Sequence, residues 1–154
     1  MNVTKGLIYI LELSTMERLE MQFVPDTVTD NRAASYGEVQ VVGRNNPHYH
    51  FGGGSDTLSF TIDFHVSEEN RADVVRKCRW LKSLAYADGS SKAPPRVKLI
   101  FGDLYRDDEW IVTSVSTNYS LFDTNNNMMP KQAYVDISLS LDPSRNLKWR
   151  DVKR

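Results

Sequence analysis

Asp56–Leu84, with the sequence DTLSFTIDFHVSEENRADVVRKCRWLKSL, predicts a strand followed directly by a helix. Apolar residues first recur at every second position: Leu58, Phe60, Ile62, Phe64 and Val66. Because successive side chains of a strand point to opposite faces, we expect one face to pack against a core. After Ser67 the apolar spacing becomes helical, with Ser67 as a suitable N-cap and Gly89 as a stop. This pattern predicts a helix over about residues 68–87.

The opposite face of the same strand is small and polar. Its residues are Thr57, Ser59, Thr61, Asp63 and His65. Ordinary solvent-facing strands have this pattern, and it also suits a sheet that lines a water-filled channel. A polar strand face with no reactive cluster beside it favours an assembly component over an enzyme.

The rest of the chain adds strands around this one main helix. Apolar patterns predict strands at Gly6–Leu13, Leu19–Phe23, Val97–Phe101, Trp110–Tyr119 and Ala133–Leu141, with a shorter candidate from Glu38 to Val42. The fold class is therefore mainly β (α+β), a barrel or sandwich of six to seven antiparallel strands with one helix. We expect one domain over residues 1–142, a long loop or arm over 26–51 within it, and a basic C-terminal tail over 143–154.

The composition is that of an ordinary globular domain. The chain has 154 residues, of which 40% are hydrophobic, and its net charge is −1. No global field therefore draws it to nucleic acid or to a membrane surface. Cys78, the only cysteine, lies on the apolar stripe of the predicted helix. With no signal peptide or membrane-spanning run in the sequence, we expect the protein to be made and kept in a cytoplasm until it assembles, with no membrane partner.

Reactive groups do not form a convincing site. His48 and His50 share a face of an extended segment but lack further ligands with metal-site spacing. The acidic residues 107–109 are expected to form a solvated turn, because paired catalytic carboxylates must face each other across a cleft. The glycine triplet at 52–54 lacks the Lys and Ser/Thr of a phosphate-binding loop. We predict no catalytic residue, cofactor or metal, and no enzymatic activity.

The C-terminal tail combines cations with apolar residues. Its cations are Arg145, Lys148, Arg150, Lys153 and Arg154, and its apolar residues are Leu147, Trp149 and Val152. Contact with nucleic acid phosphates and simple solvation are both compatible with the charges. The interleaved apolar residues favour a strand or clip added to a partner.

Several segments in order resemble a known family over about residues 5–142. They are Phe23-Val24-Pro25 after the first hairpin, GGGSDTLSF at 52–60, Pro94-Pro95-Arg96-Val97 running to Phe101-Gly102-Asp103, Val112–Asp123, and the strand from Ala133 to Leu141. Together these segments resemble the tube-like baseplate proteins of contractile injection systems and contractile-tailed phages, a family whose tube-like domain is often followed by a LysM domain. The sequence has no LysM-sized segment after its last predicted strand, so no direct peptidoglycan-binding role is expected.

This resemblance implies a tail-tube-like fold and a structural role in the baseplate of a virion. Members form sixfold rings that join the tail tube to the spike-bearing hub. The implied partners are further copies of the chain, the tail tube protein, hub and spike proteins, sheath or wedge proteins, and the DNA or tape-measure protein in the lumen. Thr57, Ser59, Thr61, Asp63 and His65 become candidate lumen-facing residues. Candidate subunit-interface residues are Phe23, Pro25, Gly52, Gly53, Gly54, Phe122, Asp123 and Trp149.

A β-sandwich module that binds a ligand or glycan is the alternative function. Such a module needs exposed aromatic residues gathered into a stacking platform. Tyr36, Tyr49, Phe51, Tyr105 and Trp149 are scattered along the sequence, although folding could bring some of them together.

Overall fold

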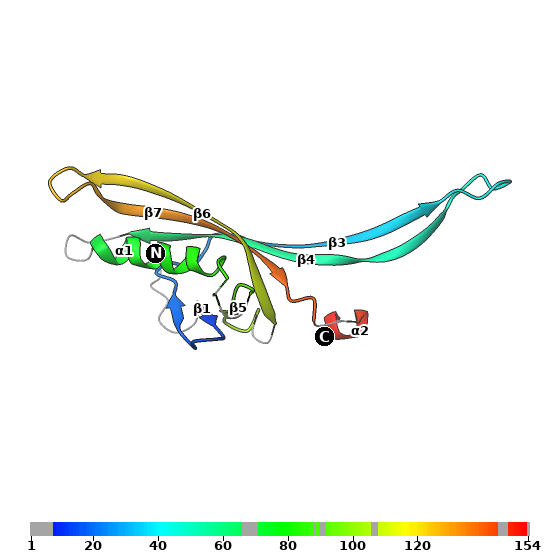
Figure 1. Ribbon diagram of the computed structural model, residues 1–154, viewed down its shortest axis with the longest axis horizontal. Helices are drawn as coiled ribbons and strands as arrows, with labels where there is room; N and C mark the ends of the chain where they lie inside the picture. The colour runs from blue at the N-terminus through cyan, green and yellow to red at the C-terminus, as the bar shows by residue number, and fades with distance from the viewer. Residues whose placement is uncertain are drawn as a thin grey trace.

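Seven antiparallel strands form one sheet in the computed structural model, which describes residues 8–65, 71–87, 89, 92–105, 108–144 and 148–153 (Figure 1). The strands are β1 (Ile8–Glu12), β2 (Arg18–Glu20), β3 (Val28–Val39), β4 (His48–His65), β5 (Arg96–Phe101), β6 (Glu109–Asp123) and β7 (Met129–Leu141). Their order is β2-β1-β5-β6-β7-β4-β3. The mainly β class is confirmed, but the sheet is open, with β2 and β3 at its edges, rather than closed into a barrel.

The core lies on one face of this sheet. Alternate residues of β4 and β7 are buried there and pair across the strands, for example Leu58 with Leu139 and Ile62 with Val135. The main helix, α1 (Arg71–Ser83), covers them with Val74, Cys78 and Leu81. The alternation predicted from Leu58 to Phe64 is therefore confirmed. Burial of these side chains supplies most of the driving force for folding.

The predicted helix ends early, and its predicted start lies outside the described residues. Ser67 and residues 68–70 belong to that undescribed part. At the other end, the N–H groups of Leu84, Ala85 and Tyr86 donate to carbonyls three residues earlier, at 3.2, 3.2 and 3.0 Å. This tighter pattern closes the helix after Ser83, because it satisfies the last carbonyls with 3₁₀-type bonds.

Residues 26–51, predicted as a long loop or arm, are mostly strand. β3 pairs with β4 along its whole length, from Val28 opposite Phe60 to Val39 opposite His48, while residues 40–42 lie outside any strand. β4 pairs with β7 only from Thr57 onward, so within the described residues no further strand lies beside the distal part of this pair. We call this part the arm: Arg32–Val39 and His48–Asp56. It projects far beyond the body, and most of its residues are exposed (Figure 1).

A β-bulge of two glycines interrupts the arm. Ala34 pairs with Gly54 and Tyr36 with Phe51, so the two-residue segment Gly52-Gly53 lies opposite the single residue Ser35. Gly53 has φ of +97°, which side chains other than glycine rarely tolerate. At Gly54, a Cβ atom would lie 2.4 Å from the carbonyl oxygen of Ala33. The glycine triplet therefore forms a β-bulge, and this bulge shifts the alternation of side chains along β4 by one residue.

Candidate functional site

The face of the sheet opposite the core is a continuous polar surface, which we call the polar face. On β4 it contains the predicted residues Thr57, Ser59, Thr61, Asp63 and His65. The strand register places Ser140, Ser138, Asp136, Tyr134 and Gln132 of β7 beside them, then Ser114, Ser116, Asn118 and Ser120 of β6. Thr29 and Asn31 of β3 pair with Ser59 and Thr57 on the other side. The candidate lumen residues therefore belong to one four-stranded surface.

Hydroxyl and amide groups dominate the polar face. None of the residues named above is Lys or Arg, and its carboxylates are Asp63 and Asp136. The Thr61 hydroxyl donates a hydrogen bond to Asp136 Oδ1 at 2.5 Å. Such a surface is hydrophilic and weakly acidic, so it holds water and has no cation that would bind a polyanion.

The four strands of the polar face have unpaired edges on both sides. Within the described residues, no strand pairs with the outer edge of β3. The outer edge of β6 is paired with β5 only from Glu109 to Ile111, which leaves residues 113–122 without a strand neighbour in the same described part. Unpaired edges present backbone N–H and C=O groups that readily accept another strand.

The predicted interface residue Phe23 follows Gln22, whose side chain covers the backbone edge at the end of β4. The Gln22 side chain donates from Nε2 to the His65 carbonyl at 2.8 Å, and its Oε1 accepts from the His65 N–H at 3.0 Å. This amide pairs with the end of β4 where β3 no longer does. Phe23 and Pro25 come next and are half-buried in the body.

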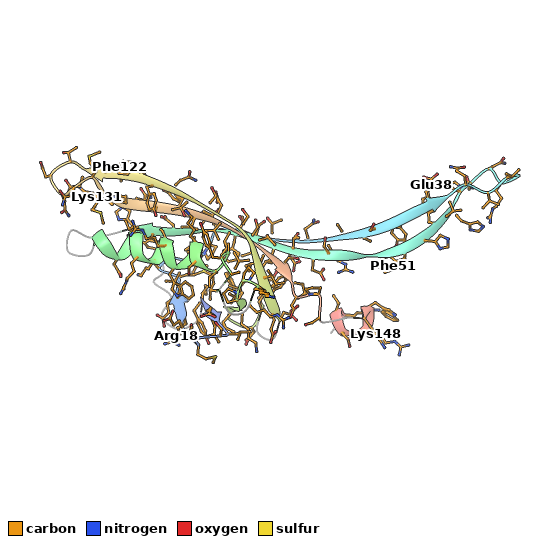
Figure 2. All side chains as sticks on the ribbon, in the orientation of Figure 1. Arg18, Glu38, Phe51, Phe122, Lys131 and Lys148 are labelled. Carbon is orange, nitrogen blue, oxygen red and sulfur yellow. The ribbon has the colours of Figure 1, made fainter. Side chains whose placement is uncertain are left out.

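The structure does not bring the other predicted interface residues together. Gly52, Gly53 and Gly54 form the bulge of the arm. Phe122 is exposed at the opposite end of the molecule, while Asp123 accepts N–H bonds within the β6–β7 turn (Figure 2). Trp149 is exposed on the short helix α2 (Trp149–Val152). These surfaces lie at separate places and do not form one site.

Sequence reasoning missed two neighbours of Phe122. Leu121 and Met128 are also exposed, and both have positive φ, +55° and +58°. We call Leu121, Phe122 and Met128 the hairpin tip. Large residues in the left-handed region are uncommon. The sequence signal for this exposed tip was the apolar pair Leu121-Phe122 directly before the turn sequence Asp-Thr-Asn.

The acidic cluster near residue 108 has a structural role where the structure describes it. Arg96 lies 3.1 Å from the buried carboxylate of Asp142 and 3.9 Å from Glu109. Hydrogen bonds from the Ser144 side chain and backbone lower the pKa of Asp142, and Arg96 lowers it further, against the effect of burial. Asp107 lies outside the described residues. This cluster joins β5, β6 and the end of β7.

The described residues contain neither a metal cluster nor a membrane-spanning helix. His48, on the arm, contacts Arg44 of the connecting loop, and no group of three or more His, Cys, Asp or Glu residues in the described ranges could hold a metal. Among the helices that the structure describes, none has the length and apolar character needed to cross a bilayer. Burial raises the pKa of Cys78 to about 11, although a hydrogen bond with Tyr119 opposes this. The Cys78 thiol is therefore unreactive near neutral pH.

A model of the family described as "Contractile injection system tube protein" matches residues 11–148, which is most of the chain. A chain in a solved structure titled "Virion of native gene transfer agent (GTA) particle" is 12% identical, with a TM-score of 0.45. The match covers 90% of this chain and 94% of that one. A chain from the tail of an empty GTA particle is 15% identical, with a TM-score of 0.40 and the same coverage. A search of curated proteins found no match.

Proposed function

The chain belongs to the contractile injection system tube protein family, and we propose that it forms the ring that initiates the tail tube and joins it to the spike-bearing hub. The observation that carries this proposal is the polar face, four strands wide and unpaired at both edges. A surface of this kind is completed when the β3 edge of one copy pairs with the β6 edge of the next.

Strand direction supports closure by repetition. Neighbouring strands in β6-β7-β4-β3 are all antiparallel, so β6 and β3 run in opposite directions. A rotation about the ring axis, to which the strands are inclined, gives β6 the same direction in every copy. The β3 edge therefore always meets an antiparallel β6 edge, and a heterologous interface of this kind forms a ring when the rotation between copies closes after a whole number of subunits.

In such a ring the polar face lines the channel. The core and α1 lie on the opposite, outer side. Hydroxyl groups keep the channel wet, and Asp63 and Asp136 repel the phosphates of passing DNA or the carboxylates of an acidic tape-measure protein. The ring is sixfold, belongs to the baseplate of a virion tail, and contacts tube, hub, spike and sheath or wedge proteins.

Chemical labelling tests the inside and outside of the assembly. Ser59→Cys places a thiol on the polar face, and Lys82→Cys places a matched exposed thiol on α1. Buried Cys78 contributes little background. In free protein a maleimide attached to a large polymer should label both variants. In assembled tails it should label Lys82→Cys alone, and electron microscopy should show sixfold rings. Equal labelling of both positions in tails would contradict the channel assignment.

Glycan binding is the second candidate, because folding gathers three of the scattered aromatic residues. Tyr36, Tyr49 and Phe51 lie on one face of the arm. The rings of Tyr36 and Phe51 are inclined at 57° to each other, however, so they do not form a flat platform for one sugar ring. The arrangement suits packing against a protein side chain better.

A further inference from the structure

The arm has an exposed aromatic face that the ring proposal does not use. We call Tyr36, Tyr49 and Phe51, together with Glu38, the aromatic face of the arm. Tyr36 pairs with Phe51 and Glu38 with Tyr49, so the register places the four side chains on one side of the two strands. Each aromatic side chain is more than 60% exposed, and the Tyr36 and Phe51 ring centroids lie 5.5 Å apart.

The glycine bulge determines which side of the arm becomes aromatic. β3 has no extra residue, so Tyr36 and Glu38 share a side with Asp30, whose carboxylate accepts a hydrogen bond from Tyr105 on the core side. Without the bulge, Phe51 and Tyr49 would continue the series Thr57, Ser55 on the polar side. The extra residue moves both onto the core side, next to Tyr36. The bulge therefore concentrates the aromatic residues on the side away from the polar face.

Helix α2 carries a complementary set of side chains. Trp149 and Val152 are 68% and 70% exposed. The Arg150 guanidinium and the Lys153 ammonium group lie 5.4 and 5.6 Å from the Trp149 ring centroid. Asp151 accepts the Lys148 N–H at 3.0 Å, which stabilises this single turn. Figure 1 shows α2 on the same side of the long strands as α1.

We propose that α2 of a second copy docks on the aromatic face of the arm. Trp149 packs against Tyr36 and Phe51, and the cations beside it meet Glu38. Opposite charge and matching aromatic character favour this occupant, since Trp, Tyr and Arg dominate the energetics of protein contacts. In the isolated chain both partners are exposed, so the contact forms between copies. It rests on the proposed ring, which brings the copies together.

Cysteine pairs test the contact directly. Rings are assembled from a mixture of Glu38→Cys protein and a size-tagged Arg150→Cys protein, then oxidised. We expect a disulfide-linked dimer of mixed mass, whereas a mixture of Lys82→Cys with Glu38→Cys should give none. An intramolecular disulfide in monomeric protein that carries both substitutions would overturn the proposal, as would the absence of any mixed dimer from rings seen by electron microscopy.

Charge reversal supplies a second readout. Glu38→Arg and Arg150→Glu should each reduce incorporation into tails by about tenfold, and the double variant should recover most of the loss. If rings assemble with wild-type efficiency in all three variants, the docking proposal fails while the ring proposal stands. If wild-type protein forms no rings at all, both fail.

Discussion

Two buried carboxylates illustrate how single residues stabilise the turns of this protein. Glu12 accepts N–H bonds from Ser14 at 2.9 Å and Thr15 at 3.2 Å, as well as bonds from both hydroxyls. Asp142 is held in the same way by Ser144, with Arg96 beside it. Each carboxylate replaces water with donors from its own turn, which is what makes burial of the charge tolerable.

These carboxylates predict a loss of stability in acid. Burial raises the pKa of Glu12, but hydrogen bonds from Ser14 and Thr15 outweigh it, so the folded pKa is below its ordinary value. The pKa of Asp142 is also lowered. Their stabilisation is therefore present above about pH 4, the unfolded pKa, and is lost as pH falls through the folded values. Urea unfolding at several pH values should show a shallower acid slope in Glu12→Gln and Asp142→Asn. An unchanged slope in both variants would contradict this reading.

Tyr105 provides a second prediction at the scale of a residue. Its hydroxyl donates to Asp30 Oδ2 at 2.9 Å, and its ring meets Trp110 edge to face. Burial, and then the hydrogen bond and charge of Asp30, raise the pKa of Tyr105 to about 12. Tyr105→Phe should lower the free energy of unfolding by about 1 kcal/mol, measured by denaturant titration. Exposed Tyr86→Phe, the control, should change it by less than about 0.5 kcal/mol.

At the scale of elements, predictability follows burial. β4 and β7 could be predicted because their buried residues alternate with polar ones. The same alternation predicted which polar residues lie together on the opposite face. β3 could not, because almost every residue from Val28 to Val39 is exposed and pairing with β4 alone makes it a strand. Glycines at 52–54 signal unusual backbone, but a bulge and its register depend on a partner strand far away in sequence. Where the candidate interface residues lie relative to one another also depends on contacts between distant parts of the sequence, so their separation in the fold could not be predicted.

The glycine bulge predicts a local effect on the arm. Gly54→Ala would place a Cβ atom 2.4 Å from a backbone oxygen, and Gly53→Ala would put a side chain at φ +97°. The left-handed conformation alone costs about 1–2 kcal/mol. Hydrogen exchange in the arm should therefore accelerate in both variants, with little change in α1. Gly37→Ala is the matched control, since its nearest atom would be 4.0 Å away. Equal exchange in all three variants would count against the bulge.

At the scale of the whole molecule, the polar face predicts how the channel responds to added charge. Ser59 is flanked across the strands by Thr29 and Ser138, whereas Thr61 lies beside Asp136. Ser59→Arg should therefore add an unpaired cation to every copy in the ring, while the arginine of Thr61→Arg is partly neutralised by Asp136. We expect both variants to fold, because exposed substitutions usually change stability by less than about 0.5 kcal/mol.

Assembly and cargo passage must be measured separately for these variants. Tails counted by electron microscopy should be equally abundant, and delivery of DNA or another acidic cargo should fall more in Ser59→Arg than in Thr61→Arg. If Ser59→Arg instead unfolds the isolated subunit, its position belongs to a packed surface and the channel assignment is wrong.

The arm, at the end of β3 and β4, and the hairpin tip, at the end of β6 and β7, lie at opposite ends of the molecule (Figure 1). A ring built by repeating the contact between β3 and β6 would therefore have two different openings, one surrounded by aromatic arms and the other by Leu121, Phe122 and Met128. Turning one subunit over would set β3 against β3 and β6 against β6, and the repeated contact between β3 and β6 would be lost. A stack that begins on such a ring has a fixed polarity, and the next ring always contacts the same end of the ring before it. One-way growth would then be a property of the subunit itself and would need no separate regulator.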